Sequence, residues 1–326
     1  MKEAKPTPRL KAAIAGVGHI GRFHTRHLVQ HADWRCMGLY DADAVRAQEI
    51  SEEYGVPVKD SVDALLTGID ALFITAPTVA HFDLGYRALE AGIHVFIEKP
   101  ITSTLDQARK LVELATEKDL RIQVGHIERF NPALLALNGL QLEPRFIEAH
   151  RLVAFTPRGL ANPVIHENMI HDIDIILSLV RSPVTDIQAN GVAVVSNHAD
   201  IANARLSFKN GCVANVTASR VSLHPTRKMR IFQPETYITI DFQQGSTELY
   251  RLTEEMTIDG ADKVIPLEGS SRQIVYENLP LPQGDAMYAE QAAFARAIRE
   301  GSRPVIDGRD GLEALRIADS INEQLQ

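Results

Sequence analysis

Short apolar runs and helix-like stretches alternate through the first 125 residues of the chain. The apolar runs have the length of strands buried on both faces, and the stretches between them space their apolar residues as helices do. Strict alternation of strand and helix is typical of parallel β-α-β units, so the sequence predicts an α/β fold with a doubly wound parallel sheet. The expected strands are 11–17, 34–40, 71–76, 94–97 and 121–125, and the expected helices are 20–30, 42–54, 82–91 and 105–118.

The pattern changes after Gly125. From residue 184 to 276, expected strands follow one another with short turns and no helix between them, which indicates a large, mostly antiparallel sheet. The length of 326 residues favours two domains, here 1–125 and an α+β domain over 126–326. The remaining elements expected in the second part are helices at 131–140, 166–180, 285–299 and 309–325 and a strand at 145–155. The two closing helices can also pack back on the first domain.

Composition excludes several classes of protein. The formal net charge of −8 argues against a general nucleic-acid binder, although a few local arginines suffice to bind a phosphorylated small substrate. No stretch approaches ~18 consecutive apolar residues, and the N-terminus lacks the apolar core of a signal peptide, so we expect a cytoplasmic protein without a membrane span. Cys36 and Cys212 are far apart within apolar runs, so we expect reduced core residues.

A G-x-G-x-x-G sequence, Gly16 to Gly21, follows the first expected strand and opens the first expected helix. In this context the glycines permit a tight turn and a close approach of the backbone, and the helix N-terminus presents free N–H groups to a pyrophosphate. We therefore interpret the sequence as the dinucleotide loop of a Rossmann domain. The predicted cofactor contacts in it are Gly16, Gly18, His19 and Ile20; the alternative is a glycine turn with no ligand.

Asp41 ends the second expected strand, twenty residues after Gly21. An acidic side chain there hydrogen-bonds the adenosine ribose hydroxyls and repels a 2′-phosphate, so the sequence predicts NAD as the cofactor in preference to NADP. Alternatively, Asp41 or Asp43 caps the following helix, a role that is compatible with ribose binding.

Further motifs resemble the Gfo/Idh/MocA oxidoreductase family over nearly the whole chain. They are Glu98-Lys99-Pro100, the loop from Thr75 to His81, a His-x-x-Asp helix and the segment from Asp307 to Leu315. The resemblance implies a Rossmann domain joined to a large sheet, one face of which meets the substrate while the other commonly mediates a homodimer or homotetramer. It also implies cofactor contacts from Thr75, Pro77, His81, Glu98 and Lys99.

Lys99 carries over the lysine of the family's E-K-P motif, which lies near the nicotinamide and the reacting hydroxyl. A lysine at the carboxyl edge of the sheet lies where open α/β sheets bind ligands, and its charge can stabilise a developing alkoxide as hydride leaves. The alternative is a solvated surface lysine.

The second catalytic element implied by the resemblance is the helix that contains His171. The family's helix usually reads Asp-x-x-x-His with the histidine as acid/base; here His171 matches, while Glu167 stands where aspartate is typical. Residues four apart share a helix face, so Glu167 can still approach the histidine or the substrate. The alternatives are a core histidine or a metal site made by Glu167, His171 and Asp174; we expect no metal, because hydride transfer to NAD does not need one.

Within the family, residues 124–132 and the Met-Ile-His-Asp-Ile-Asp run resemble UDP-N-acetylglucosamine 3-dehydrogenases. This implies oxidation of a UDP-sugar at C3 to a 3-keto sugar, which a pathway aminotransferase would aminate for lipopolysaccharide or another surface glycan. Arg129 and Asn131 are candidate substrate contacts, with an inter-domain salt bridge and a helix cap as alternatives. Arg158 and Arg220 are candidate contacts for the diphosphate, and a solvated strand edge is the alternative for each.

Two other functions remain open. The chain could oxidise a free polyol or sugar or reduce another ketone, or it could be an NAD-binding regulator without catalysis. The presence of both Lys99 and His171 argues against the regulator.

Overall fold

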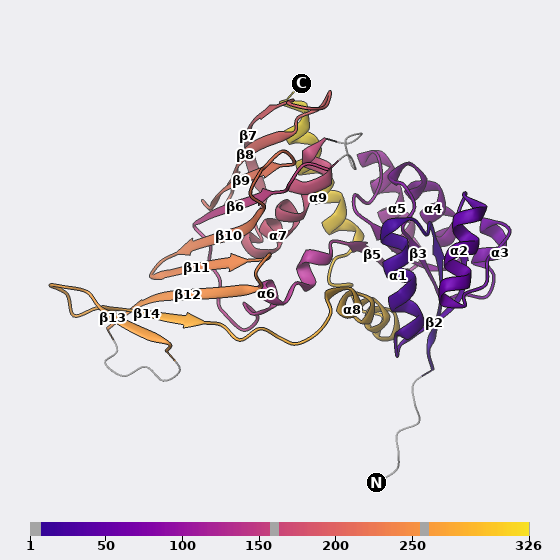
Figure 1. The fold of residues 1–326 in the computed structure, drawn as a ribbon, viewed down its shortest axis with the longest axis horizontal. Coiled ribbons are helices and arrows are strands. Elements are labelled where there is room, and N and C mark those ends of the chain that lie inside the picture. The colour runs from indigo at the N-terminus through magenta and orange to yellow at the C-terminus, as the bar shows by residue number, and fades with distance from the viewer. Residues whose placement is uncertain (1–7, 157–162, 255–260, 326) are drawn as a thin grey trace, which may run out of the picture. The chain divides into compact units, whose positions relative to one another are not determined.

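The structure is a computed structural model, and it describes residues 8–156, 163–254 and 261–325. These residues form two compact units (Figure 1). The first unit contains the chain up to Ile127 together with Asp285–Glu313, and the second contains Glu128–Gly284 together with the residues from Ala314 onward. Within the described ranges, no helix is both long enough and apolar enough to cross a bilayer.

The first unit is built on a five-stranded sheet with the strand order β2-β1-β3-β4-β5, in which every pair is parallel. The prediction of a doubly wound parallel sheet is therefore confirmed. Its strands are β1 (Leu10–Ala15), β2 (Trp34–Tyr40), β3 (Ala71–Ile74), β4 (His94–Glu98) and β5 (Ile122–Gly125). Its helices are α1 (His19–Gln30), α2 (Ala44–Tyr54), α3 (Val62–Leu66), α4 (His81–Glu90), α5 (Leu105–Glu117) and α8 (Ala286–Glu300).

Local sequence signals account for the ends of these helices. Asp43 caps α2 by accepting hydrogen bonds from the backbone N–H groups of Val45 and Arg46, and Gly55 ends the helix in the left-handed conformation at a φ of 68°. Helix α3, which Ser61 caps, was not predicted from the sequence. This helix has only five residues, so it is too short to show a helical period in the sequence.

Helix α8 completes the core of the first unit although it lies near the end of the chain. Phe294 of α8 is fully buried and lies 5.7 Å from Trp34 and 5.8 Å from Phe73, measured between ring centroids. The indole N–H of Trp34 donates to the backbone carbonyl of Gln291 over 3.0 Å. The apolar face of α8 is thus part of the Rossmann core.

The second unit is built on a nine-stranded sheet with the order β13-β14-β12-β11-β10-β6-β9-β8-β7. All its pairs are antiparallel except β6 with β9, which confirms the prediction of a mostly antiparallel sheet. Its strands are β6 (Phe146–Leu152), β7 (Val184–Val192), β8 (Ile201–Phe208), β9 (Val213–Ser219), β10 (Thr226–Gln233), β11 (Thr236–Asp241), β12 (Ser246–Thr253), β13 (Lys263–Pro266) and β14 (Gln273–Asn278).

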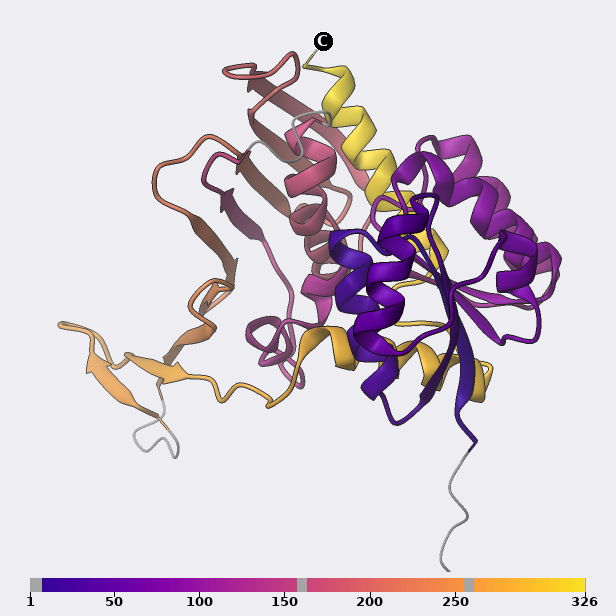
Figure 2. The ribbon, with the colours of Figure 1, turned by 45° about the vertical axis from the view of Figure 1, so that its right-hand side comes forward.

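Helices pack on one face of this sheet. Figures 1 and 2 show α7 (Ile170–Val180) and the C-terminal part of α9 (Gly308–Glu323) along it, and buried residues such as Ile147 and Ile321 join one hydrophobic core there. The opposite face carries a row of half-buried aromatic side chains with neighbouring ring centroids 4.8–5.6 Å apart. The row consists of Phe146, Phe232, Tyr237, Tyr250 and Tyr276.

Two helix predictions in this unit need correction. The helix expected at 131–140 is only α6 (Pro132–Leu135), because the backbone then tightens into i→i+3 hydrogen bonds such as Leu137 N–H to Leu134 C=O. The helix expected at 166–180 begins instead as a π-helical turn at Ile165–Met169, which continues into α7.

Candidate active site

The glycines of the dinucleotide loop meet two different requirements. A Cβ on Gly16 would lie 2.4 Å from Cα of Ala76, and one on Gly21 would lie 2.0 Å from the carbonyl oxygen of Gly16, so packing alone demands both glycines. A Cβ on Gly18 would meet nothing within 4 Å. Gly18 therefore leaves open space where a pyrophosphate can approach the backbone.

The N-terminus of α1, which begins at His19, suits an anion. Gly18 stands at its cap position and has no side chain to accept a hydrogen bond from the first-turn N–H groups. These groups and the positive end of the helix dipole are the donors that a cofactor phosphate uses. The loop thus fits NAD, with the backbone of Gly18, His19 and Ile20 placed to hold it, whereas the predicted contact Gly16 donates its N–H to the carbonyl oxygen of Tyr40 over 2.8 Å.

Asp41 lies beside this loop. Its carboxylate accepts from the backbone N–H of Val17 over 2.7 Å and from that of Asp43 over 3.0 Å. Asp43, and not Asp41, caps α2, so the capping alternative applies to Asp43. Each oxygen of Asp41 keeps a second lone pair for a ribose hydroxyl.

Arg46 places a cation on the other side of the same loop residue. Its Nε donates to the carbonyl oxygen of Val17 over 3.0 Å, and its Nη1 lies 3.0 Å from Glu49. Because an arginine near the ribose is the group that accommodates a 2′-phosphate, the preference for NAD should depend on the carboxylate of Asp41.

We expect Asp41→Ala to lower the NAD-over-NADP affinity ratio about tenfold or more, since a hydrogen bond to a charged group contributes ~1.5–3 kcal/mol. Dissociation constants for both cofactors, measured by calorimetry, test this. Asp43→Ala is the matched control: it loses the α2 cap but should keep the ratio. The double variant Asp41→Ala/Arg46→Ala should lose the NADP affinity that the single variant gains. A native protein that prefers NADP contradicts the assignment.

The loop after β3 is hydrogen-bonded to the glycine loop. The Thr75 hydroxyl donates to the carbonyl oxygen of Gly16. The buried ring of His81 lies with Nε2 2.8 Å from the carbonyl oxygen of Ala76 and Nδ1 3.0 Å from that of Pro100. Burial lowers the pKa of His81, so the neutral ring donates to one of the two carbonyls. Thr75 and His81 therefore shape the site, while Pro77 is exposed in the loop.

The E-K-P motif ends β4 at the carboxyl edge of the sheet, the edge where the glycine loop also lies. The Glu98 carboxylate contacts Nε2 of His24 over 2.9 Å and accepts from the backbone N–H of Lys99 over 3.2 Å. A Cβ on Gly125 would lie 2.9 Å from the Glu98 carboxyl carbon, so Gly125 leaves room for this carboxylate. Lys99 follows directly and is half-buried.

In the second unit, a π-helical turn contains Glu167, and His171 lies in the first turn of α7. Such turns occur frequently at functional sites. Sequence reasoning missed the ion pair beside them: Arg151 binds both carboxylate oxygens of Asp172, at 2.8 and 3.0 Å, and its Nη1 lies 2.9 Å from Glu128. Arg151 and Asp172 are both buried, so neither charge could stay there without the other.

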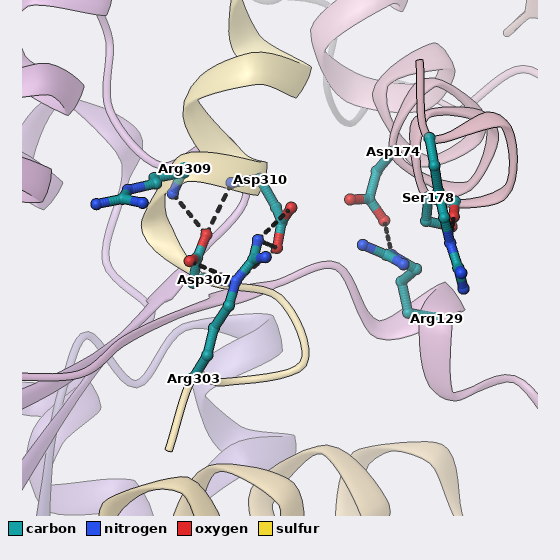
Figure 3. Close-up of polar contacts among 8 residues, drawn as sticks. Arg129, Asp174, Ser178, Arg303, Asp307, Arg309 and Asp310 are labelled. Atoms are coloured by element: carbon teal, nitrogen blue, oxygen red, sulfur yellow. Dashed lines mark hydrogen bonds and ion pairs between the residues drawn. The ribbon is translucent and has the colours of Figure 1, made fainter. Parts of the chain in front are cut away.

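The segment before α6, which contains Glu128 and Arg129, makes a second ionic contact that holds α7. Nε of Arg129 lies 2.9 Å from a carboxylate oxygen of Asp174, within the second unit (Figure 3). The Asn131 side chain caps α6 by accepting from the N–H of Ala133, as the helix-cap alternative predicts. Asp172 and Asp174 follow His171 within one turn of α7, so their two ion pairs fix the position of this part of the helix.

Glu167, His171 and Asp174 do not form a metal site. In the part of the chain that the structure describes, no group of three or more His, Cys, Asp or Glu side chains could hold a metal ion. His166, which precedes Glu167, has its Nε2 2.7 Å from Asp319.

Of the two candidate diphosphate contacts, Arg158 and Arg220, only Arg220 lies within the described residues. Arg220 is buried, and its Nε lies 3.0 Å from Asp200, which also accepts from three backbone N–H groups of residues 194–196. Its guanidinium is therefore engaged in an internal ion pair, and a diphosphate would have to compete with Asp200 for it.

The segment at the start of α9 is structural. The Asp307 carboxylate accepts from the N–H groups of Arg309 and Asp310, and the Arg303 guanidinium bridges Asp307 at 2.7 Å and Asp310 at 2.9 Å (Figure 3). A Cβ on Gly311 would lie 2.7 Å from a methyl of Val124. These contacts explain the Asp-Gly-Arg-Asp-Gly sequence as a helix start packed on β5.

Comparison with known proteins identifies the chain's relatives. Residues 10–126 match the model of the oxidoreductase family with the NAD-binding Rossmann fold, and residues 148–246 match that of the GFO/IDH/MocA C-terminal domain. The chain belongs to the Gfo/Idh/MocA oxidoreductase family. This member is accordingly an NAD-dependent oxidoreductase, as the motifs predicted.

Individual relatives match nearly the whole chain. The UDP-N-acetylglucosamine 3-dehydrogenase of Acidithiobacillus ferrooxidans is 38% identical over 311 residues, which cover 95% of each chain. A solved structure of that enzyme superposes with a TM-score of 0.89 and covers 98% of each chain at 36% identity. The scyllo-inositol 2-dehydrogenase (NAD(+)) of Bacillus subtilis is 25% identical over 336 residues, covering 95% of this chain and 92% of its own.

Proposed function

We propose that this protein oxidises the C3 hydroxyl of UDP-N-acetylglucosamine to a 3-keto sugar, with NAD as the hydride acceptor and release of one proton. The observation that carries the proposal is the similarity to the Acidithiobacillus UDP-N-acetylglucosamine 3-dehydrogenase. At equal coverage of this chain, identity to that enzyme is 38%, against 25% to the inositol enzyme.

The candidate catalytic side chains suit this reaction. The ammonium of Lys99 would stabilise the alkoxide that forms as the hydroxyl loses its proton, and His171 would accept that proton, a role that a histidine fills near neutral pH. NAD, when bound, takes up the hydride. Glu167 and Arg158 are the proposed substrate contacts. Arg129, Asn131 and Arg220 are weaker candidates, because Asp174, the α6 cap and Asp200 already engage them.

We expect NADH formation with UDP-N-acetylglucosamine and little with free N-acetylglucosamine or myo-inositol. Loss of the diphosphate should forfeit binding energy that positions C3. Because a secondary alcohol is a poor hydride donor to NAD at neutral pH, the assay should contain a ketone trap or an aminotransferase with an amino donor. Trapped product from inositol and none from any UDP-sugar would favour the polyol alternative, and turnover of no alcohol or ketone would favour the regulator.

Two kinds of partner follow from the proposal. An aminotransferase would consume the 3-keto sugar, and the amino sugar would enter lipopolysaccharide or a related glycan. A second copy of this chain would bind the open face of the nine-stranded sheet, as the family resemblance implies. The aromatic row from Phe146 to Tyr276 supplies half-buried apolar surface suited to a homodimer or homotetramer.

A further inference from the structure

His24 is a buried polar side chain on the cofactor helix that the mechanism above does not use. It lies on the face of α1 that packs on the sheet, with Gly21, Thr25 and Leu28, and its side chain is fully buried. Its ring lies 5.0 Å from that of Phe96 and 6.1 Å from that of Phe73. Because an imidazole in apolar surroundings must satisfy its nitrogens by hydrogen bonds, the partners of His24 identify its role.

Gln291 of α8 determines which ring nitrogen of His24 carries hydrogen. The Gln291 side-chain nitrogen lies 3.2 Å from Nδ1 of His24 and 3.4 Å from the His24 carbonyl oxygen. A carbonyl oxygen only accepts, so the amide must present its NH₂ group, and Nδ1 is then an acceptor. The hydrogen is therefore on Nε2, which donates to the Glu98 carboxylate over 2.9 Å.

The hydrogen bond from His24 acts on a carboxylate that burial would otherwise neutralise. Burial alone raises the pKa of Glu98, but the hydrogen bond from Nε2 of His24, the charge of Lys99 and the backbone N–H of Lys99 act against burial, and the net effect is a lowered pKa. His81 of α4 also interacts electrostatically with this carboxylate. On β5, Gly125 adjoins it without a side chain.

We infer that His24 is a positioning residue: by donating to Glu98 it keeps a carboxylate ionised and oriented against the backbone of Lys99, and so holds the catalytic lysine in place. The inference rests on the proposed role of Lys99. It assigns α8 a part as well, because Gln291 sets the tautomer of His24.

Two substitutions of His24 separate this role from packing. A glutamine side chain places its amide nitrogen close to the position of Nε2, whereas an asparagine reaches only to that of Nδ1. We expect His24→Asn to reduce kcat about tenfold, the effect of losing one charge-assisted hydrogen bond, with little change in KM. His24→Gln should restore kcat. Both variants should keep the same NAD dissociation constant, whereas His24→Asn should melt below His24→Gln, because its buried Glu98 carboxylate has lost a hydrogen bond.

A second readout needs no substrate. The ¹³C NMR signal of the Glu98 carboxyl carbon, assigned by its absence in Glu98→Gln, reports its ionisation against pH. In His24→Asn the carboxylate should protonate at higher pH than in the native protein, because burial is no longer offset; His24→Gln should titrate as the native protein does. Identical titrations in all three folded proteins, or native kcat in His24→Asn, overturn the inference. Native turnover in Lys99→Met instead refutes the proposed site, so the two failures are distinguishable.

Discussion

Lys99→Met is expected to lower kcat by ~10²-fold or more, the contribution of one charged group placed at a reacting oxygen. Methionine keeps most of the length of the side chain and removes its charge, so the packing at the end of β4 should change little. NAD affinity should stay near native, because the glycine loop makes the phosphate contacts. Steady-state NADH formation and calorimetric NAD binding measure the two effects. Lys110→Met is the matched control, since Lys110 is exposed on α5.

His171→Ala should lower kcat by a similar factor, because no other group would accept the substrate proton at the same position. The double variant with Lys99→Met should be less impaired than the product of the single effects predicts, since groups that act on one transition state are not additive. Near-native rates of both single variants with the true substrate show that the assigned site is wrong.

Gly21→Ala is expected to destabilise the first unit and to abolish NAD binding. The new methyl would lie 2.0 Å from a backbone oxygen of Gly16 and 2.8 Å from the Thr75 hydroxyl, so the loop has to shift. Overpacking costs ~1–3 kcal/mol where flexible side chains yield, and a backbone atom yields less. A fall in melting temperature of several degrees should accompany the loss of binding.

Gly18→Ala separates binding from stability in the same loop. Gly18 has a negative φ (−62°, with ψ −151°), and a methyl on it would meet nothing within 4 Å. The melting temperature without cofactor should therefore stay native, while NAD affinity falls because the methyl occupies space that the pyrophosphate needs. Native NAD affinity in Gly18→Ala would show that the pyrophosphate does not approach this glycine.

The two sheets and most of the helices could be predicted because strong local signals in the sequence separate them. Buried parallel strands appear as short apolar runs, and the glycine loop lies between one such run and a helix. Prediction failed where the apolar pattern was present but the backbone departed from the regular helix. Leu134 and Leu137 are spaced as on a helix, yet α6 ends at Leu135 and Leu137 lies in a turn with an i→i+3 bond. Hydrophobic spacing does not distinguish a helix from such a turn.

The candidate site was predicted only for residues that belong to sequence motifs. Asp41 and Lys99 follow strand ends, so sequence position alone indicates their edge of the sheet. His24, Arg151 and Glu128 were missed because only the folded chain shows what each contacts. Signals were available: His24 interrupts the apolar face of α1, and two aspartates on the apolar helix α7 required partners. The partner of Asp172, twenty-one residues away, could not be identified from the sequence.

The return of Asp285–Glu313 to the first unit has a consequence for how the protein is made. Domains commonly fold one after another as they leave the ribosome, with the N-terminal domain first. Here the sheet of the first unit is synthesised early, but Phe294 and Gln291, which cover Trp34, emerge only after the whole nine-stranded sheet. A nascent chain therefore exposes part of its Rossmann core throughout the synthesis of the second sheet. Ribosome-bound chains that end before residue 285 should be substrates for chaperones that bind apolar surfaces.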